Sequence, residues 1–155
     1  MCAAHERGIV LCGYSAGSMC WFEQGITKGV GHAVRAEGLG LLAGSHCVHY
    51  SQDPDRRTTF LGTIAAGELD AGLALDDHAA AVFRDGRIVD AVRSRESSGA
   101  WWVRRQGDRA AEERIETRPI SAPAPEHEPS LAEMRDLRRR RRIGRLGGGP
   151  PARRR

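Results

Sequence analysis

A serine between two glycines is the feature of this sequence that most suggests chemistry. Residues 13–17 read Gly-Tyr-Ser-Ala-Gly and fit the pattern G-x-S-x-G, in which a sharp strand-to-helix turn presents a serine hydroxyl as a nucleophile. The flanking glycines allow a close backbone approach that a side chain would block. The backbone amide of Ala16 would then point toward the oxygen that becomes negative during acyl transfer. The motif therefore predicts acyl transfer to Ser15.

A serine nucleophile needs a base, which is most often a histidine. The sequence contains His5, His32, His46, His49, His78 and His127. His46 and His49 are expected on a loop after an apolar segment, where together with Cys47 they could alternatively bind a metal ion. A zinc site needs a third or fourth protein ligand at a workable spacing, and Cys47 lies at a poor distance between the two histidines. We therefore expect no metal site.

The third group of such a site is a carboxylate that orients the imidazole and stabilises its protonated form. Asp76 and Asp77 directly follow residues 72–75, a short apolar run typical of a buried strand. In an open parallel sheet, functional sites gather at the carboxyl ends of the strands. Taken alone, each aspartate is better explained as part of a solvated turn or a helix cap, so residue type does not identify which of them is the acid.

Elements that would position these residues follow from the apolar pattern. Residues 8–12 predict a buried strand of a parallel sheet, and residues 19–22 suit a helix packed on it. The glycine-rich stretch 25–44 is expected to be mostly loop, whereas the apolar spacing within 56–69 predicts a helix. Asp85-Gly86 between two apolar runs, 79–83 and 87–92, predicts a hairpin, and residues 100–103 predict one last strand. The expected fold is α/β: a partial doubly wound, mainly parallel sheet with a nucleophile elbow and a C-terminal hairpin.

Composition divides the chain near residue 106. Residues 1–106 have a net charge of −1 and form the expected catalytic domain, whereas residues 107–155 have a net charge of +5 and are rich in proline, glycine and arginine. A segment of that kind cannot bury enough apolar surface to fold, so we expect 107–155 to be disordered. Its five consecutive arginines at 138–142 would attract phosphates. No aromatic residues interleave them to stack bases, so we do not expect nucleic-acid binding.

The cysteines and the hydropathy indicate a compartment. Cys2, Cys12, Cys20 and Cys47 form no C-x-x-C pair. The chain shows neither a charged-then-apolar leader nor an apolar run of about 20 residues that could span a bilayer. Free thiols are typical of a reducing compartment, and we therefore expect a soluble cytoplasmic protein that contacts no membrane.

Four segments together resemble the peptidase E family, serine dipeptidase-like enzymes with a class I glutamine amidotransferase-like fold. These segments are residues 13–22, 38–50, 56–57 and 76–80. The resemblance extends from about residue 8 to 105. It implies that Ser15 is the nucleophile and that His49, which precedes an aromatic residue, is the base. It also implies hydrolysis of short peptides, in the best-known cases those beginning with aspartate, and we expect no cofactor.

The sequence departs from the family pattern in two respects. Many relatives have an aspartate just after the nucleophile helix, where this chain has Lys28. In the related cyanophycin-degrading enzymes the acid instead lies in a segment that resembles residues 75–78, so we favour Asp77 as the orienting acid. Relatives also have a further N-terminal segment, which includes a glycine-rich loop expected to supply a second oxyanion amide.

The second departure leaves two functional hypotheses open. The chain could be a serine-type peptidase that acts on short peptides. Alternatively, it could be a truncated and catalytically idle family member, or one half of a split enzyme that a complementing N-terminal half completes. A sheet cut before the nucleophile strand would expose an edge, which would also favour a homo-oligomer.

Overall fold

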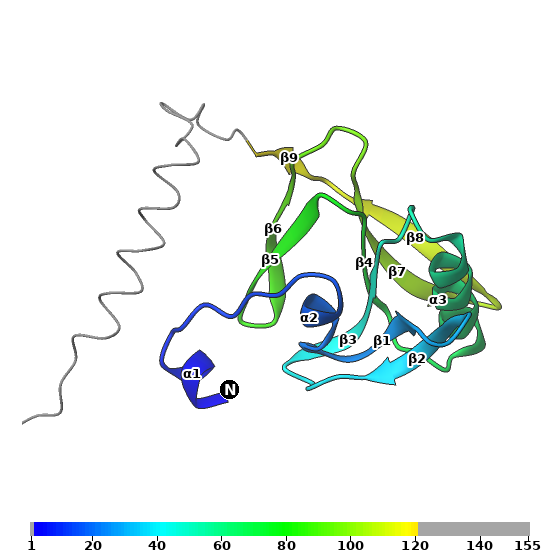
Figure 1. Cartoon of the computed structure of the whole chain (residues 1–155), viewed down its shortest axis with the longest axis horizontal. Helices are drawn as coiled ribbons and strands as arrows, with labels where there is room; N and C mark the ends of the chain where they lie inside the picture. Colours follow the sequence, from blue (N-terminus) through cyan, green and yellow to red (C-terminus); the bar gives the residue numbers. More distant parts are fainter. Residues whose placement is uncertain (1, 121–155) are drawn as a thin grey trace, which may run out of the picture. The chain divides into compact units, whose positions relative to one another are not determined.

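The computed structural model describes residues 2–120 of the chain (Figure 1). These residues form three helices, α1 (Cys2–Glu6), α2 (Ala16–Met19) and α3 (Pro54–Ala66), and two sheets. None of the helices in this range is long and apolar enough to cross a membrane. The arginine run at 138–142, and the disorder predicted for 121–155, lie outside the described residues.

The larger sheet has six strands in the order β2-β1-β3-β4-β7-β8. Their bounds are β1 (Phe22–Lys28), β2 (Ala33–Glu37), β3 (Leu42–Val48), β4 (Gly72–Leu75), β7 (Ala100–Gln106) and β8 (Arg109–Ile115). β3 runs parallel to both of its neighbours, β1 and β4, whereas the remaining pairings are antiparallel. The fold is α/β as predicted, but the sheet is mixed rather than mainly parallel.

The smaller sheet contains the predicted hairpin. It consists of β5 (Ala79–Arg84), β6 (Arg87–Arg93) and the short β9 (Arg118–Pro119), in that order. Asp85 and Gly86 connect β5 to β6 with φ angles of 51° and 73°, the left-handed conformation that a two-residue hairpin turn requires at both positions. This local prediction is confirmed.

The two faces of the larger sheet bury different sets of side chains, because successive residues of a strand point to opposite faces. Toward α3, Cys47 of β3 packs in one cluster with Phe60 and Ile64 of the helix. On the other face, Leu73 and Phe22 form a second cluster, and Phe83 of the β5–β6 hairpin packs edge-on against Phe22. α2 contacts β1 and β3, and α2 and α3 lie on opposite sides of these strands (Figure 1).

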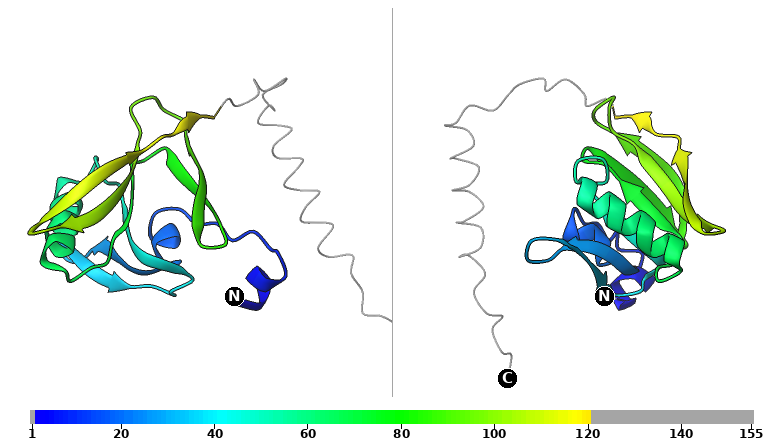
Figure 2. Two further views of the ribbon diagram at one scale, coloured as in Figure 1. Left: turned by 180° about the vertical axis from the view of Figure 1, so that it is seen from behind. Right: turned by 90° about the vertical axis from the view of Figure 1, so that its right-hand side faces the viewer.

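α3 confirms the helix predicted within 56–69 and is bounded by local signals. Asp53 caps its N-terminus by accepting the N–H of Arg56 at 3.3 Å, and Pro54 occupies the first turn, where the missing N–H costs nothing. Gly67 ends the helix in the left-handed conformation with φ 77°. The 90° view shows this helix lying along one side of the sheet (Figure 2).

The strand predicted at residues 8–12 does not form. This stretch has no strand partner within residues 2–120, and the exposed fractions of Ile9 and Val10 are 50% and 87%. Both sides of β3 are occupied by β1 and β4, and the elbow is reached from a segment that forms no strand. Residues 19–22 are also not a helix as predicted, because α2 ends at Met19 and β1 begins at Phe22.

Two other segments contain strands where the sequence predicted none. Residues 25–44 were expected to be mostly loop, yet β1, β2 and the start of β3 lie there, because Ile26 and Ala33 bury their side chains against α3. Strands β8 and β9 lie within 107–120, where disorder was predicted. β8 is an edge strand whose charged residues face solvent, a composition typical of protected sheet edges.

Candidate active site

Ser15 occupies a sharp, strained turn at the start of α2. Its φ of 52° and ψ of −127° place it in a sparsely populated region that costs about 1–3 kcal/mol and persists only when the surroundings hold it. Its carbonyl accepts the N–H groups of Ser18 at 3.0 Å and Met19 at 3.1 Å. A Cβ on Gly13 would lie 1.9 Å from the carbonyl oxygen of Gly17, so only glycine fits before the turn.

His49 lies directly after β3 and faces Ser15. Its Nε2 is 2.8 Å from the Ser15 hydroxyl oxygen. The backbone of His49 is left-handed, with φ 57°, and its carbonyl accepts the N–H of Asp53 at 2.8 Å. The next residue, Tyr50, is fully buried in the cluster beneath α3. This anchor fixes the backbone that carries His49.

Asp77 lies two residues beyond β4 and completes the arrangement. Its Oδ1 accepts a hydrogen bond from Nδ1 of His49. A carboxylate only accepts, so the imidazole proton belongs on Nδ1 and Nε2 is left to accept the hydroxyl proton of Ser15. The side chains of His49 and Asp77 are 32% and 43% exposed, which leaves the site open to a substrate.

Asp76, the alternative acid, is buried and has a different role. Its two carboxylate oxygens accept the backbone N–H groups of Ser51 and Gly99, each at 2.9 Å. Asp76 therefore ties the segment after His49 to the segment before β7. Asp77 is held from both sides of its backbone, because its N–H donates to Gln52 Oε1 at 3.0 Å and its carbonyl accepts the Ser98 hydroxyl at 2.6 Å. No sequence signal pointed to Gln52 or Ser98.

Lys28 belongs to a separate ion-pair cluster. Its Nζ lies 3.1 Å from Asp53 and 3.3 Å from Asp55 at the start of α3. The hydrogen bond that Lys28 donates to the Asp53 carboxylate is the main reason why the pKa of Lys28 is raised above its ordinary value. The lysine found where relatives have an acid therefore joins β1 to the N-terminus of α3.

His46 is a buried member of β3, not a loop residue as predicted. Its Nδ1 donates to the carbonyl of Leu73 at 2.8 Å, and its Nε2 lies 3.2 Å from the hydroxyl oxygen of Ser18. Burial lowers the pKa of His46 to about 4, so the imidazole is neutral at physiological pH. The neighbouring Cys47 points to the opposite face. Within residues 2–120, no cluster of His, Cys, Asp and Glu side chains has the arrangement of a metal site.

Five other residues are placed as follows. The N–H of Ala16, the expected oxyanion donor, forms no hydrogen bond to any described residue, so it is free to bind an oxygen. Arg56 and Arg57, which lie near His49 in the sequence, pair with Asp53 and Glu112. Trp21 and Trp102 pack against the second cluster.

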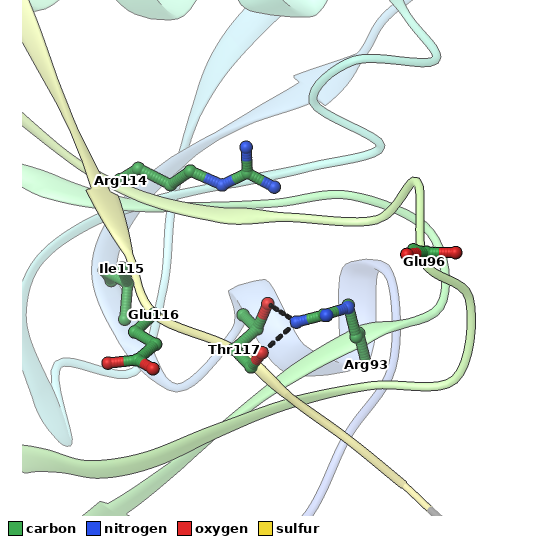
Figure 3. A pocket seen from close by; sticks show the side chains of 6 residues that line it. All are labelled: Arg93, Glu96, Arg114, Ile115, Glu116 and Thr117. Carbon is green, nitrogen blue, oxygen red and sulfur yellow. Dashed lines mark hydrogen bonds between the residues drawn. The ribbon is translucent and has the colours of Figure 1, made fainter.

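A separate open pocket lies near the end of β8 (Figure 3). It is lined by Arg93, Glu96, Arg114, Ile115, Glu116 and Thr117. The guanidinium of Arg93 donates to the carbonyl of Thr117 and, at 2.8 Å, to its hydroxyl, so this cation already has protein partners. The pocket contains neither Ser15, His49 nor Asp77, and the hydrogen-bonded triad remains the candidate active site.

Comparisons with known proteins point to a peptidase family. The sequence model of peptidase family S51 matches residues 1–90. A Bacillus subtilis (strain 168) protein described as uncharacterized peptidase YgaJ is 39% identical over 100 residues, which cover 64% of this chain and 44% of that relative. The chain thus matches less than half the length of this relative. No solved structure is significantly similar to the chain.

Replacing Asp76 tests its structural role. Asp76→Asn leaves one oxygen to accept, so one of the two backbone amides loses its partner. Because hydrogen bonds to charged groups contribute about 1.5–3 kcal/mol, we expect the free energy of unfolding in urea to fall by about 2 kcal/mol. The exposed Asp70, whose side chain has no partner among the described residues, gives the control variant Asp70→Asn. Equal losses in the two variants would contradict the role assigned to Asp76.

The buried imidazole of His46 predicts a pH-dependent stability. Its folded-state pKa of about 4 lies below the unfolded value of 6.5, so between these values the unfolded chain binds the additional proton and stability falls as the pH is lowered. We expect this group to remove about 2 kcal/mol of unfolding free energy between pH 7 and pH 5. Urea unfolding at both pH values measures the loss. His46→Gln should abolish this part of the slope, whereas His32→Gln at an exposed position should retain it.

Proposed function

This chain belongs to peptidase family S51, and we propose that it is a serine-type peptidase that hydrolyses short peptides through an acyl-enzyme on Ser15. The observation that carries the proposal is the continuous hydrogen-bond chain from the Ser15 hydroxyl through His49 to Asp77. Those three side chains come from separate parts of the sequence. Their roles follow from the tautomer of His49, which leaves Nε2 as the proton acceptor.

In the proposed reaction, Ser15 Oγ attacks the carbonyl carbon of the scissile peptide bond while His49 Nε2 takes the hydroxyl proton. The Asp77 carboxylate stabilises the imidazolium that forms. His49 then gives its proton to the leaving amine as the C–N bond breaks, which leaves an acyl ester on Ser15. A water molecule attacks the ester with His49 again as base, and the released serine oxygen regains its proton.

The N–H of Ala16 is the proposed donor to the oxyanion that forms on the substrate carbonyl. It follows the nucleophile directly and has no other partner among residues 2–120. A single donor of this kind is worth about 10²–10³-fold in rate. The positive φ of Ser15 sets the direction of the following peptide unit. The strained turn therefore also orients the Ala16 N–H that is the proposed oxyanion donor.

Two further assignments belong to the same proposal. We assign the parallel strands β1, β3 and β4 with the nucleophile turn to a class I glutamine amidotransferase-like fold. We also propose a cytoplasmic location, which is supported by the free thiols of Cys12, Cys20 and Cys47.

The alternative is a catalytically idle member of the family. The observation that favours it is the exposed segment before the elbow, in which the exposed fractions of Val10 and Tyr14 are both 87%. A nucleophile turn that lacks a paired strand in front of it is less constrained than the G-x-S-x-G context requires. A complementing partner would supply that constraint. The labelling experiment below separates these hypotheses.

A fluorophosphonate probe tests the nucleophile directly. Attack of Ser15 Oγ on phosphorus expels fluoride and leaves a stable adduct, which mass spectrometry locates. We expect the adduct on Ser15 of the native chain and a loss of about 10³-fold or more in labelling rate for Ser15→Ala. The exposed Ser97 gives the control Ser97→Ala, which should label normally. A chain that is folded by circular dichroism yet unlabelled would favour the idle alternative.

Replacing Asp77 tests the choice of acid. Asp77→Asn presents an amide that can donate to Nδ1 of His49 and so favours the wrong imidazole tautomer. In triads of this kind that change lowers the rate by about 10⁴-fold at neutral pH, and we expect a similar loss in the rate of Ser15 labelling. Asp85→Asn, in the left-handed hairpin turn that asparagine tolerates, is the matched control. Full labelling of Asp77→Asn would mean that another acid orients His49.

A further inference from the structure

We propose that His46, acting through the hydroxyl of Ser18, is a positioning residue that holds the nucleophile turn in register with His49. This inference rests on the proposed function of Ser15. It assigns a second histidine of the same strand to the site, with no direct contact to a substrate.

His46 is locked in place on the face of the sheet that carries α2. Its exposed fraction is 1%, and its ring lies against Phe22 with the ring centroids 4.7 Å apart. Its Nδ1 donates to the carbonyl of Leu73 on the adjacent strand β4. The imidazole is therefore fixed by the same pair of strands, β3 and β4, that brings His49 and Asp77 together.

The partners of the ring decide which nitrogen carries the proton. A carbonyl oxygen only accepts, so Nδ1 of His46 is the protonated nitrogen and Nε2 has a free lone pair. A buried lone pair without a donor costs about 1–3 kcal/mol. The Ser18 hydroxyl, 3.2 Å away, is the only donor to this nitrogen within residues 2–120.

Ser18 connects this fixed ring to the strained residue. Its hydroxyl oxygen is 3.2 Å from Nε2 of His46 and 2.8 Å from the carbonyl oxygen of Ser15. The hydroxyl donates its single hydrogen to the Ser15 carbonyl in this geometry. Because that carbonyl also accepts two backbone N–H groups, the hydroxyl can rotate and donate to Nε2 of His46 without leaving the carbonyl unpaired. This contact fixes the position of Ser18 relative to the sheet, and Ser18 in turn fixes the peptide unit of Ser15.

α2 needs such a connection because it cannot hold the turn alone. It has four residues, a single turn, and isolated turns of helix are unstable. Met19 packs tightly over Gly25, where an added Cβ would lie 2.4 Å from the Met19 side chain. That contact sets how closely α2 approaches β1, but apolar packing is not directional. Among residues 2–120, the hydrogen bond from Ser18 to His46 is the only one that joins a side chain of α2 to a side chain of the sheet.

The test measures how fast Ser15 reacts in Ser18→Ala and in His46→Asn, in which the amide can still donate to Leu73 but does not reach Ser18. Fluorophosphonate labelling at increasing probe concentration separates reversible binding from the covalent step. Because a misplacement of about 1 Å costs on the order of 10²-fold in rate, we expect the covalent step to slow by about 10-fold or more in each variant, with probe binding unchanged. Ser18→Thr, which keeps the hydroxyl, should restore the rate, and Ser97→Ala is the control.

Both substitutions remove the same interaction, the contact between Ser18 and His46. The covalent step in the double variant Ser18→Ala/His46→Asn should therefore be no slower than in the slower single variant. Normal labelling of Ser18→Ala would overturn the proposal, as would losses that multiply in the double variant. If Ser18→Ala does not fold, the rates of Ser18→Thr and His46→Asn decide: the proposal requires the first to be near normal and the second to be slow.

A second measurement separates this inference from the proposed function. Nitrogen-15 NMR of the histidine rings in the full chain reports which ring nitrogen carries the proton and whether Nε2 of His49 accepts a hydrogen bond. We expect the Nδ1-protonated form for His46, and a shift of the His49 Nε2 signal in Ser18→Ala but not in Ser97→Ala. An unlabelled native chain that shows this shift would refute the proposed function alone. An unmoved His49 signal would refute the positioning role, whether or not the chain reacts.

Discussion

The parallel pairing of β3 with β4 is the constraint on which the rest of the structure depends. Its register places Val48 opposite Leu75. The segments that follow β3 and β4 therefore leave the sheet side by side, at the carboxyl ends of the two strands. His49 and Asp77 emerge there, and the hydrogen bond between their side chains needs no further folding. Asp76 then reinforces the meeting point by accepting amides from both neighbouring segments.

Successive residues of β3 alternate between the apolar core on one face of the sheet and the proposed site on the other. Cys47 and, just past the strand, Tyr50 face the apolar cluster beneath α3, where full burial fixes the backbone. His46 faces the other way, toward α2 and the nucleophile turn. A polar residue in such a buried position is tolerated because both ring nitrogens have partners. One strand thus anchors the fold on one face and contacts the proposed site on the other.

The site combines a rigid half with a half that is held less firmly. His49 and Asp77 follow closely after the paired strands β3 and β4, whereas Ser15 is reached through a segment without a strand partner in the described residues. A strained serine persists only where its neighbours over-determine it. The contact between Gly13 and Gly17, the packing of Met19 on Gly25 and the link from Ser18 to His46 are the interactions that do so here.

The sequence by itself determined the turns and the helix whose conformation depends on residues adjacent in the chain. Asp85-Gly86 specified a hairpin because both positions need a left-handed backbone. The apolar spacing beyond Arg56 specified α3, and the pattern around Ser15 specified a sharp turn at the start of a helix. Asp77 was placed after a strand for the same reason, since the apolar run before it is a local pattern.

Tertiary structure alone decided which elements pair and which buried polar groups meet. The apolar run at residues 8–12 resembles a strand, but pairing is a property of two segments, and both sides of β3 are taken by β1 and β4. The charged strand β8 was missed because an edge strand is stabilised by its neighbour rather than by its own composition. The sequence likewise proposed two histidines and two aspartates without assigning all their partners. The contact of His46 with Ser18, and that of Asp76 with two distant amides, exist only once the strands are in register.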